Sequence, residues 1–333
     1  MKMKRRQTLS VIIPTKNRPE SLDRVLSALN KQRPRVDEVV VVDTSDRMFQ
    51  SETRTIVNSF PSMNTRYRKL SHSSASGARN YGIKCSTGDI LAFLDDDSVP
   101  ESGWVQAIQR AVKVGPFWFR GQCIDASESN TIAHRFYTFY NELTTRDFKH
   151  QWSSFGRWKG YKMADLIQAG NFFVGRDVLA SMHPVFDEHL FPFIAEGTDL
   201  SLRIRKSGHQ ILSVPKAKIR HYFLRLGYRS FVLHEAFWYG RALAIFAQRS
   251  RHLLGVFGHI VSRKMRRKRI VHFWNLMRGG YVLFRKKYAQ NTMYNCLFLL
   301  ICINYLIFLG LGSLYGTFEY AWRLRMHLLR KKP

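Results

Sequence analysis

Cysteine is scarce in this chain, with 4 among 333 residues. The four lie neither in the close pairs of a structural zinc site nor in the dense pattern of a disulfide framework. They are Cys85, Cys123, Cys296 and Cys302. We therefore expect reduced cysteines that act as packing residues, and we exclude zinc fingers and small disulfide-stabilised domains.

Acidic residues are also few. The chain has 24 Asp and Glu against 53 Lys and Arg, a formal net charge of +29. Nucleic acid, an anionic lipid surface or a polyphosphate ligand could each explain such an excess. Basic residues gather in the second half, in the runs 263–269, 285–287 and 330–332, beside an apolar segment. This arrangement favours a membrane surface, and we expect no nucleic-acid partner.

One segment alone, residues 295–322, is a candidate for membrane insertion, and its length permits one span of about 20 residues. Basic residues flank both ends, so a single span would leave one basic flank outside, against the positive-inside tendency. We expect a hairpin or in-plane insertion, with a single span or a buried soluble helix as alternatives. Near the start, the apolar run Leu9–Ile13 is too short for a signal peptide, so the N-terminal part should stay in the cytoplasm.

Strand and helix patterns alternate through the first third of the chain. Apolar runs predict strands at 9–13, 39–42, 65–70 and 90–94, and helical spacing predicts helices from Pro19 and over 76–85. Further strands are expected at 117–124, 171–174, 211–214 and 218–222, with a helix over 198–205. Such units predict a doubly wound, mostly parallel sheet in residues 1–225. A basic amphipathic helical region (226–290) and the apolar tail (291–333) should follow.

The most informative feature is three consecutive acids directly after the predicted strand 90–94: Asp95, Asp96 and Asp97. Open α/β sheets bind ligands at the ends of such strands. If the backbone stays extended, Asp95 and Asp97 point to one side. Two carboxylates there suit Mg²⁺ or Mn²⁺ held together with substrate phosphates. The alternatives are a solvated acidic turn, or a helix cap in which Asp97 or Ser98 precedes the helix predicted around 104–112.

Several motifs resemble, in order and spacing, family 2 glycosyltransferases of the GT-A fold, over about residues 8–225. They are Ser10–Arg18, the strand ending at Asp43, Gly77–Gly82, Phe93–Asp97 with Pro100 and Trp104, Gly170–Asn171, and Glu196–Leu200. The resemblance implies an inverting transfer of a sugar from a nucleoside diphosphate donor. It therefore implies a GT-A catalytic domain at 1–225, followed by the membrane-associated helical region.

The resemblance also implies donor-binding residues. The nucleotide pocket would be lined by Pro14, Thr15, Asn17 and Arg18. Asp43 would contact the base and Arg79 the diphosphate, whereas the residue types alone also allow Asp43 to cap a turn and Arg79 to lie on a helix surface.

For the metal, the resemblance makes Asp95 and Asp97 the D-x-D pair, with Asp97 the direct ligand of Mg²⁺ or Mn²⁺ and Asp95 or Asp96 nearer the ribose. His221 resembles a late histidine that in some GT-A enzymes also reaches the metal. A strand-end histidine can equally be a packing residue.

The catalytic base is predicted from the family's acidic pair, whose second acid is replaced here by Gly197. Glu196 is the first candidate and Asp199 the second, although an acid in the first turn of a helix is favoured by the helix dipole in any protein. On the acceptor side the resemblance implies Gly170 and Asn171, and Trp104 could stack on a sugar ring or pack in the core.

Together these features predict a metal-dependent glycosyltransferase at the cytoplasmic face of the inner membrane. Its partners would be a nucleoside diphosphate sugar, a lipid-linked or polysaccharide acceptor and anionic membrane lipid. The alternative is a non-catalytic nucleotide-sugar-binding subunit of a membrane glycan-synthesis complex, which the replacement of an acid by Gly197 favours.

Overall fold

The computed structural model of the chain describes residues 6–126, 160–164, 166–192, 194–222, 234, 236–249, 303–304, 307–308 and 310–323. The chain divides into two compact units, residues 1–128 with 148–224, and residues 129–147 with 225–333. Most of the predicted basic region at 226–290 lies outside the described residues.

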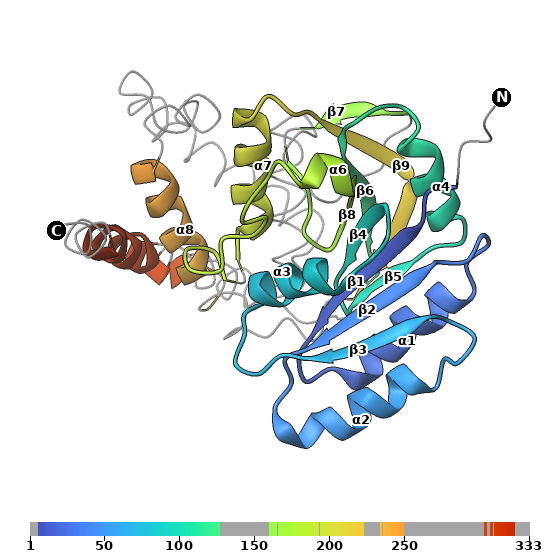
Figure 1. Cartoon of the computed structure of the whole chain (residues 1–333). Helices are drawn as coiled ribbons and strands as arrows, with labels where there is room; N and C mark the ends of the chain where they lie inside the picture. The colour runs from blue at the N-terminus through green and yellow to red at the C-terminus, as the bar shows by residue number, and fades with distance from the viewer. Residues whose placement is uncertain are drawn as a thin grey trace, which may run out of the picture. The chain divides into compact units, whose positions relative to one another are not determined.

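In the described part of the first unit, nine strands form one sheet (Figure 1). Their order is β3-β2-β1-β4-β8-β6-β9-β5, and β7 pairs with β9. The strands are β1 (Leu9–Thr15), β2 (Glu38–Asp43), β3 (Thr65–Lys69), β4 (Ile90–Leu94), β5 (Ser98–Pro100), β6 (Trp118–Asp125), β7 (Lys162–Ala164), β8 (Asn171–Gly175) and β9 (Ile211–His221).

The sheet is mixed, and the prediction of a mostly parallel sheet is wrong. Strands β3, β2, β1 and β4 are parallel neighbours. Strand β8, however, lies antiparallel between β4 and β6, and β5 and β7 are antiparallel to β9. The reason is that an apolar run predicts burial on both faces of a sheet but says nothing about strand direction.

Helices cover both faces of the sheet, as the β-α pattern predicts. The described residues of the first unit include the helices α1 (Pro19–Asn30), α2 (Arg47–Asn58), α3 (Ala75–Cys85), α4 (Trp104–Ala111), α6 (Arg176–Leu179) and α7 (Glu196–Lys206). Alternate residues of β1 enter different cores: Val11 and Ile13 pack with α1 and α4, whereas Ile12 packs in the core that includes Leu200 of α7. Figure 1 shows α1 and α2 on one side of the sheet and α3 and α7 on the other.

The two predicted closing strands are one strand, β9, with an irregularity. Gly121 of β6 pairs with Val214, and the next residue, Gln122, pairs with Lys218. The three residues between these partners bulge out of the ladder. Because Pro215 lacks a backbone N–H, a strand can contain it only at such a bulge or at an edge.

The second unit contains α8 (Ala236–Arg249) and helical residues at 303–304, 307–308 and 310–323. Within the described residues, no helix combines the length and the apolar character needed to cross a membrane. Residues 295–302, 305–306 and 309 of the predicted apolar segment lie outside the described part of the chain.

Candidate active site

The acid cluster stands at the carboxyl end of β4, where β1 and β2 also end. Asp95, Asp96 and Asp97 form a tight turn, closed by a hydrogen bond from Ser98 N to the Asp95 carbonyl oxygen (3.0 Å). The chain then enters β5 at once. Helix α4 begins six residues later, after Gly103, so the alternative that Asp97 or Ser98 caps a helix is wrong.

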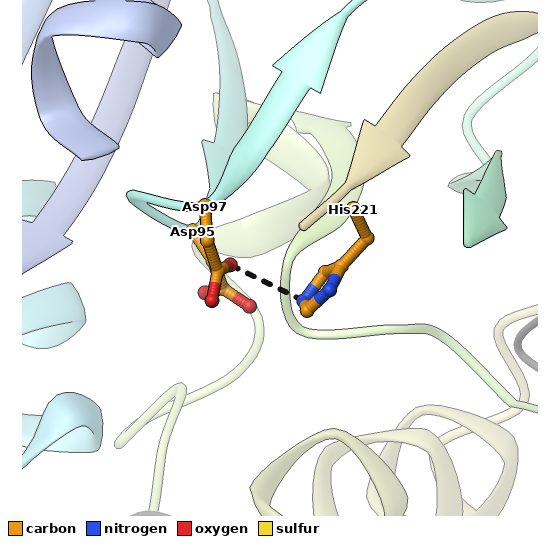
Figure 2. A group of neighbouring side chains, drawn as sticks. All are labelled: Asp95, Asp97 and His221. Atoms are coloured by element: carbon orange, nitrogen blue, oxygen red, sulfur yellow. Dashed lines mark ion pairs between the residues drawn. The ribbon is translucent and has the colours of Figure 1, made fainter. Parts of the chain in front are cut away.

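His221 joins two of these acids at the end of β9 (Figure 2). Its Nε2 lies 3.2 Å from Asp97 Oδ1. One potential ligand atom from each of Asp95, Asp97 and His221 lies within 4.8 Å of the other two. The predicted metal ligands therefore meet, although through a turn rather than through the extended backbone that the sequence argument assumed.

Asp96 faces Thr15 and Arg18. Its Oδ2 accepts a hydrogen bond from Thr15 Oγ1 (2.8 Å), and its Oδ1 lies 3.2 Å from Arg18 Nη1. The same Arg18 nitrogen is 3.1 Å from Asp97 Oδ2. Two predicted nucleotide-pocket residues are thus brought to the acid cluster, and the Arg18 side chain remains 45% exposed.

Asp96 and Asp97 are crowded together and buried. Burial, together with the charge of Asp97, raises the pKa of Asp96 to about 7, against the opposing effects of Arg18 and Thr15. Burial and the charge of Asp95 raise the pKa of Asp97, although His221 and Arg18 oppose the rise. Buried carboxylates that repel one another are stabilised by a cation.

The donor set fits a hard divalent cation. Asp97 Oδ1 is buried and accepts no hydrogen bond from the described residues. Carboxylate oxygens suit Mg²⁺ and Mn²⁺, and an imidazole nitrogen is a common ligand of transition metals. Asp95, Asp97 and His221 could therefore hold such an ion.

Arg79 of α3 connects the acid cluster with the N-terminus of α7. Its Nη2 lies 2.6 Å from Asp95 Oδ1 and its Nη1 lies 3.0 Å from Glu196 Oε1. The Arg79 side chain is 3% exposed, so the alternative of a surface arginine is wrong. Its guanidinium also lies over the Phe186 ring, 5.5 Å from the centroid.

Comparison with known proteins identifies this part of the chain. Residues 10–173 match the family described as glycosyl transferase family 2. This segment belongs to that family. It contains Arg79 and all three acids of the cluster, whereas His221 and Glu196 lie beyond the matched residues.

Curated relatives of this chain are also glycosyltransferases, and they match it over part of their length. Glycosyltransferase AglE of Haloferax volcanii is 29% identical over 187 residues, covering 55% of this chain and 57% of AglE. The probable glycosyltransferase YdaM of Bacillus subtilis is 27% identical over 229 residues, covering 65% of this chain and 50% of YdaM. The chain thus spans about half the length of the curated relatives it matches.

Two solved structures establish the GT-A fold. One is the mannosyltransferase PcManGT from Pyrobaculum calidifontis in complex with GDP-Man and Mn²⁺. It has a TM-score of 0.58 at 16% identity, over 94% of this chain and 88% of that one. The other is GalNAc-T7 with UDP, GalNAc and Mn²⁺, at a TM-score of 0.51 and 14% identity over 74% and 52% of the two chains.

The two candidate bases of this family 2 protein differ in their surroundings. Glu196 opens α7 and is held by Arg79, which places its carboxylate beside the acid cluster. Asp199 is buried, and its Oδ2 lies 2.7 Å from Arg203 Nε one turn along the same helix. A Cβ at Gly197 would lie 3.2 Å from the Ile167 carbonyl oxygen and 3.3 Å from Ala169 N. The loop before β8 thus crowds the place of the missing acid.

Gly170 lies against the acid cluster. A Cβ at this position would collide with Asp95 Oδ2, so glycine permits the close approach of this loop to the Asp95 carboxylate. The structure therefore places Gly170 beside a predicted metal ligand.

The predicted acceptor-side role does not fit Asn171 or Trp104. Both are fully buried, and Trp104 Nε1 donates a hydrogen bond to Asn171 Oδ1 (3.1 Å). Asn171 Nδ2 donates to the carbonyl oxygens of Gln122 (3.1 Å) and Ala217 (3.0 Å) at the β9 irregularity. Neither side chain has surface left for a sugar, and the core-packing alternative for Trp104 is the correct one.

The other residues predicted to bind the sugar donor lie at the carboxyl edge of the sheet, where each has its own partners. Asp43 Oδ1 accepts a hydrogen bond from Ser45 N (2.8 Å), so Asp43 does cap a turn. Its Oδ2 accepts a second hydrogen bond from Tyr67 Oη (2.7 Å). Asn17 has a left-handed backbone (φ 56°) and donates from its backbone N to Ser45 Oγ (2.8 Å). Pro14 is buried within β1.

Two residues near the site were not predicted. Tyr67 of β3 contacts Asp43, and burial together with that hydrogen bond raises the pKa of the Tyr67 phenol. Asp125 ends β6 directly opposite His221 in the sheet register. The signal for Asp125 was present, because an acid follows the predicted strand 117–124 just as the acid cluster follows strand 90–94.

Proposed function

We propose that this protein transfers a sugar from a nucleoside diphosphate donor, in the presence of Mg²⁺ or Mn²⁺, to a lipid-linked or polysaccharide acceptor. The observation that carries the proposal is the convergence of Asp95, Asp97 and His221 at the carboxyl edge of a family 2 segment. Open α/β sheets bind their ligands at this edge.

The donor would bind with its diphosphate at the acid cluster. Asp97, Asp95 and His221 would hold the cation, which when bound offsets the charge that develops on the departing diphosphate. Arg18 lies beside the same acids with nearly half of its side chain exposed, so its guanidinium can pair with a phosphate oxygen. Solved structures of the same fold support this donor class, because they hold GDP-Man or UDP with Mn²⁺.

Glu196 is the proposed general base. Its carboxylate would take the proton of the acceptor hydroxyl while that oxygen forms a bond to the anomeric carbon and the bond from this carbon to the diphosphate oxygen breaks. Attack from the face opposite the leaving group inverts the anomeric configuration. Arg79 would orient Glu196, because its Nη1 holds Glu196 Oε1 at 3.0 Å.

One relative supports the proposed lipid-linked acceptor, and the basic second half of the sequence supports the proposed location at the membrane. A Campylobacter jejuni glucosyltransferase that is named for an undecaprenol-linked acceptor is 25% identical over 126 residues, 37% of this chain and 40% of that protein. The basic second half of the chain is suited to the cytoplasmic face of the inner membrane, where anionic lipid would be a partner.

A thermal-shift screen tests the donor class. UDP, GDP and their sugar conjugates are each added with and without Mn²⁺. We expect at least one nucleotide to raise the melting temperature only when Mn²⁺ is present, because a ligand that binds the folded state stabilises it. If no nucleotide shifts the transition under either condition, the donor assignment is wrong.

A non-catalytic subunit that binds the nucleotide sugar is the second candidate. Gly197 stands where the family has an acid, which favours this candidate. The two remaining candidate bases, Glu196 and Asp199, are each paired with an arginine, and such a pair makes a carboxylate a weaker base. Release of UDP or GDP from the donor identified in the screen, measured with a membrane extract as the source of acceptor, separates the two. A transferase releases it, and a binding subunit does not.

A further inference from the structure

The helical residues at 303–304, 307–308 and 310–323, called here the C-terminal helix, expose large apolar side chains. Six large apolar side chains recur at intervals of three or four residues and are between 48% and 72% exposed. They are Ile303, Ile307, Leu311, Leu314, Phe318 and Trp322. Within the unbroken helical stretch 310–323, Leu311, Leu314, Phe318 and Trp322 fall within an arc of about 80° at 3.6 residues per turn. These four side chains form a single stripe along one side of the helix.

The opposite face of this helix is occupied. Gly312 and Gly316 lie so close to α8 that a Cβ at either position would collide with the backbone of Phe237 or Arg241. Ser313 Oγ donates a hydrogen bond to the carbonyl oxygen of Gly240 (3.0 Å). Close backbone packing of this kind requires small residues, and it leaves no room for the stripe to turn toward α8.

An ion pair fixes the rotation of the helix. Arg241 Nε and Nη2 lie 2.5 Å and 2.8 Å from the two carboxylate oxygens of Glu319, and the Arg241 side chain is 3% exposed. Arg323 also reaches Glu319, at 2.9 Å. The stripe is therefore held facing away from α8.

We propose that this stripe is a membrane-docking surface, and that the helix lies in the plane of an anionic bilayer with its apolar side chains among the acyl chains. Charge complementarity selects this occupant. The chain carries a net charge of +29, and the basic runs 285–287 and 330–332 flank the helix in sequence. A second copy of so basic a chain would be repelled, whereas an anionic lipid surface attracts it.

An in-plane position also suits the composition of the helix. Aromatic residues such as Trp322 favour the boundary between headgroups and acyl chains. The proposal rests on the membrane location proposed above and not on sugar transfer. Its test uses no nucleotide or acceptor, so each proposal can fail without the other.

The test is flotation of the full-length protein with vesicles. One set contains phosphatidylglycerol and phosphatidylethanolamine, and the other contains phosphatidylcholine alone. We expect wild type to float with the anionic set, and the double variant Phe318→Glu with Trp322→Glu to lose at least about tenfold in partition coefficient, because two large apolar groups leave the bilayer. Phe318→Leu with Trp322→Leu, which stays apolar, should lose clearly less than the Glu pair.

A matched control adds the same charge to exposed apolar residues of the first unit. Met48 and Val114 are 80% and 53% exposed, so Met48→Glu with Val114→Glu changes the net charge equally. We expect less than about a twofold loss, because surface attraction alone changes little with two charges among many. Equal losses in both double variants would reduce the effect to net charge and overturn the proposal.

Two further outcomes decide the matter. Circular dichroism checks that the stripe variant is folded, and Leu314→Glu, on a side chain 60% exposed, serves in its place if it is not. Unchanged flotation of a folded stripe variant overturns the proposal. So does a wild type that forms dimers without vesicles and becomes monomeric in the stripe variant, because the face would then belong to a second copy.

Discussion

Single residues at the carboxyl edge of the sheet carry more negative charge than burial tolerates. Asp96 and Asp97 are 5% and 8% exposed, and Arg18 supplies a cation to both. The raised pKa values of both acids show that this one guanidinium does not offset burial and mutual repulsion. A bound cation would therefore stabilise the acid cluster. Single substitutions can separate the contribution of each acid to ligand binding from its contribution to the stability of the fold.

Replacing Asp97 by Asn should weaken Mn²⁺-dependent binding of UDP or GDP by at least about tenfold, because a charged ligand is lost while the volume hardly changes. The melting temperature without metal should not fall, since removing a buried, repelled charge relieves the cluster. Calorimetry with Mn²⁺ measures the first effect. Asp23→Asn, on α1, is the control; equal nucleotide affinity in Asp97→Asn and wild type would refute the metal assignment.

Replacing Glu196 by Gln should lower turnover by roughly a hundredfold or more, the scale of a lost general base, with little change in donor affinity. The matched substitution is Asp199→Asn in the same helix, which interrupts an ion pair with Arg203 instead. Turnover and donor affinity are compared for both variants. A large loss of turnover in Asp199→Asn alone would move the base to Asp199.

At the scale of elements, the position of β8 decides the shape of the site. Asn171 is the first residue of β8, pairs with Leu94 at the end of β4, and binds both sides of the β9 irregularity. Its neighbour Gly170 allows the loop to reach Asp95. One buried amide thus connects three strands directly behind the acid cluster.

Asn171→Ala should therefore reduce the free energy of unfolding by about 3 kcal/mol, because the indole N–H of Trp104 and two carbonyl groups lose a buried partner. Urea unfolding measures the loss. Asn64→Ala, at an exposed position with a single hydrogen bond to the Asp37 carbonyl oxygen, should cost less than about 0.5 kcal/mol. Similar costs at the two sites would contradict the structural role of Asn171.

A second connection between elements predicts a pH dependence. Burial by itself would raise the pKa of Glu38, but hydrogen bonds from Ser10 and Thr87 and the charge of Arg66 lower it. A group with a lowered pKa stabilises the fold above its unfolded pKa, and this stability is lost as pH falls through the folded pKa.

Glu38→Gln should consequently cost about 1–3 kcal/mol of unfolding free energy at neutral pH, because charge-assisted hydrogen bonds are lost. The difference from wild type should narrow below about pH 4, where Glu38 begins to take up a proton. Urea unfolding across this range measures it, with exposed Glu52→Gln as the control. A difference that stays constant with pH would contradict the assignment.

At the scale of the whole molecule, the excess of basic charge and the exposed apolar helix act together. Attraction of the basic runs to anionic lipid is screened by salt, whereas insertion of apolar side chains is not. Truncation after about Lys287 should therefore release much of the protein from membranes, leaving a fraction bound through residues 263–269 that high salt removes.

The topology of the tail can be measured in intact cells. A cysteine placed after Lys331 should not react with a membrane-impermeant thiol reagent, because an in-plane helix leaves both basic flanks on the cytoplasmic side. The same reagent added after lysis should label it. Efficient labelling from outside would reveal a single span, and a wild type that stays in solution at low salt would refute membrane association.

The sequence by itself determined which strands are buried and where they end. The apolar run Ile90–Leu94 followed by three acids places a polar site at the end of a buried strand wherever that strand lies in the sheet. The order of the motifs also predicted the family. Both can be read from the local sequence, because the burial of a strand and the position where it ends depend on residues that are adjacent in the chain.

Only the tertiary structure decided which side chains meet. Residues far apart in the sequence, Arg79 with Glu196 and Asp97 with His221, become partners through the sheet order and the start of α7. The antiparallel entry of β8 likewise buries Asn171 against Trp104 and removes both from the acceptor side. Strand direction, register and the turn of the acid cluster are set by packing between distant segments, and no local pattern of apolar and polar residues encodes them.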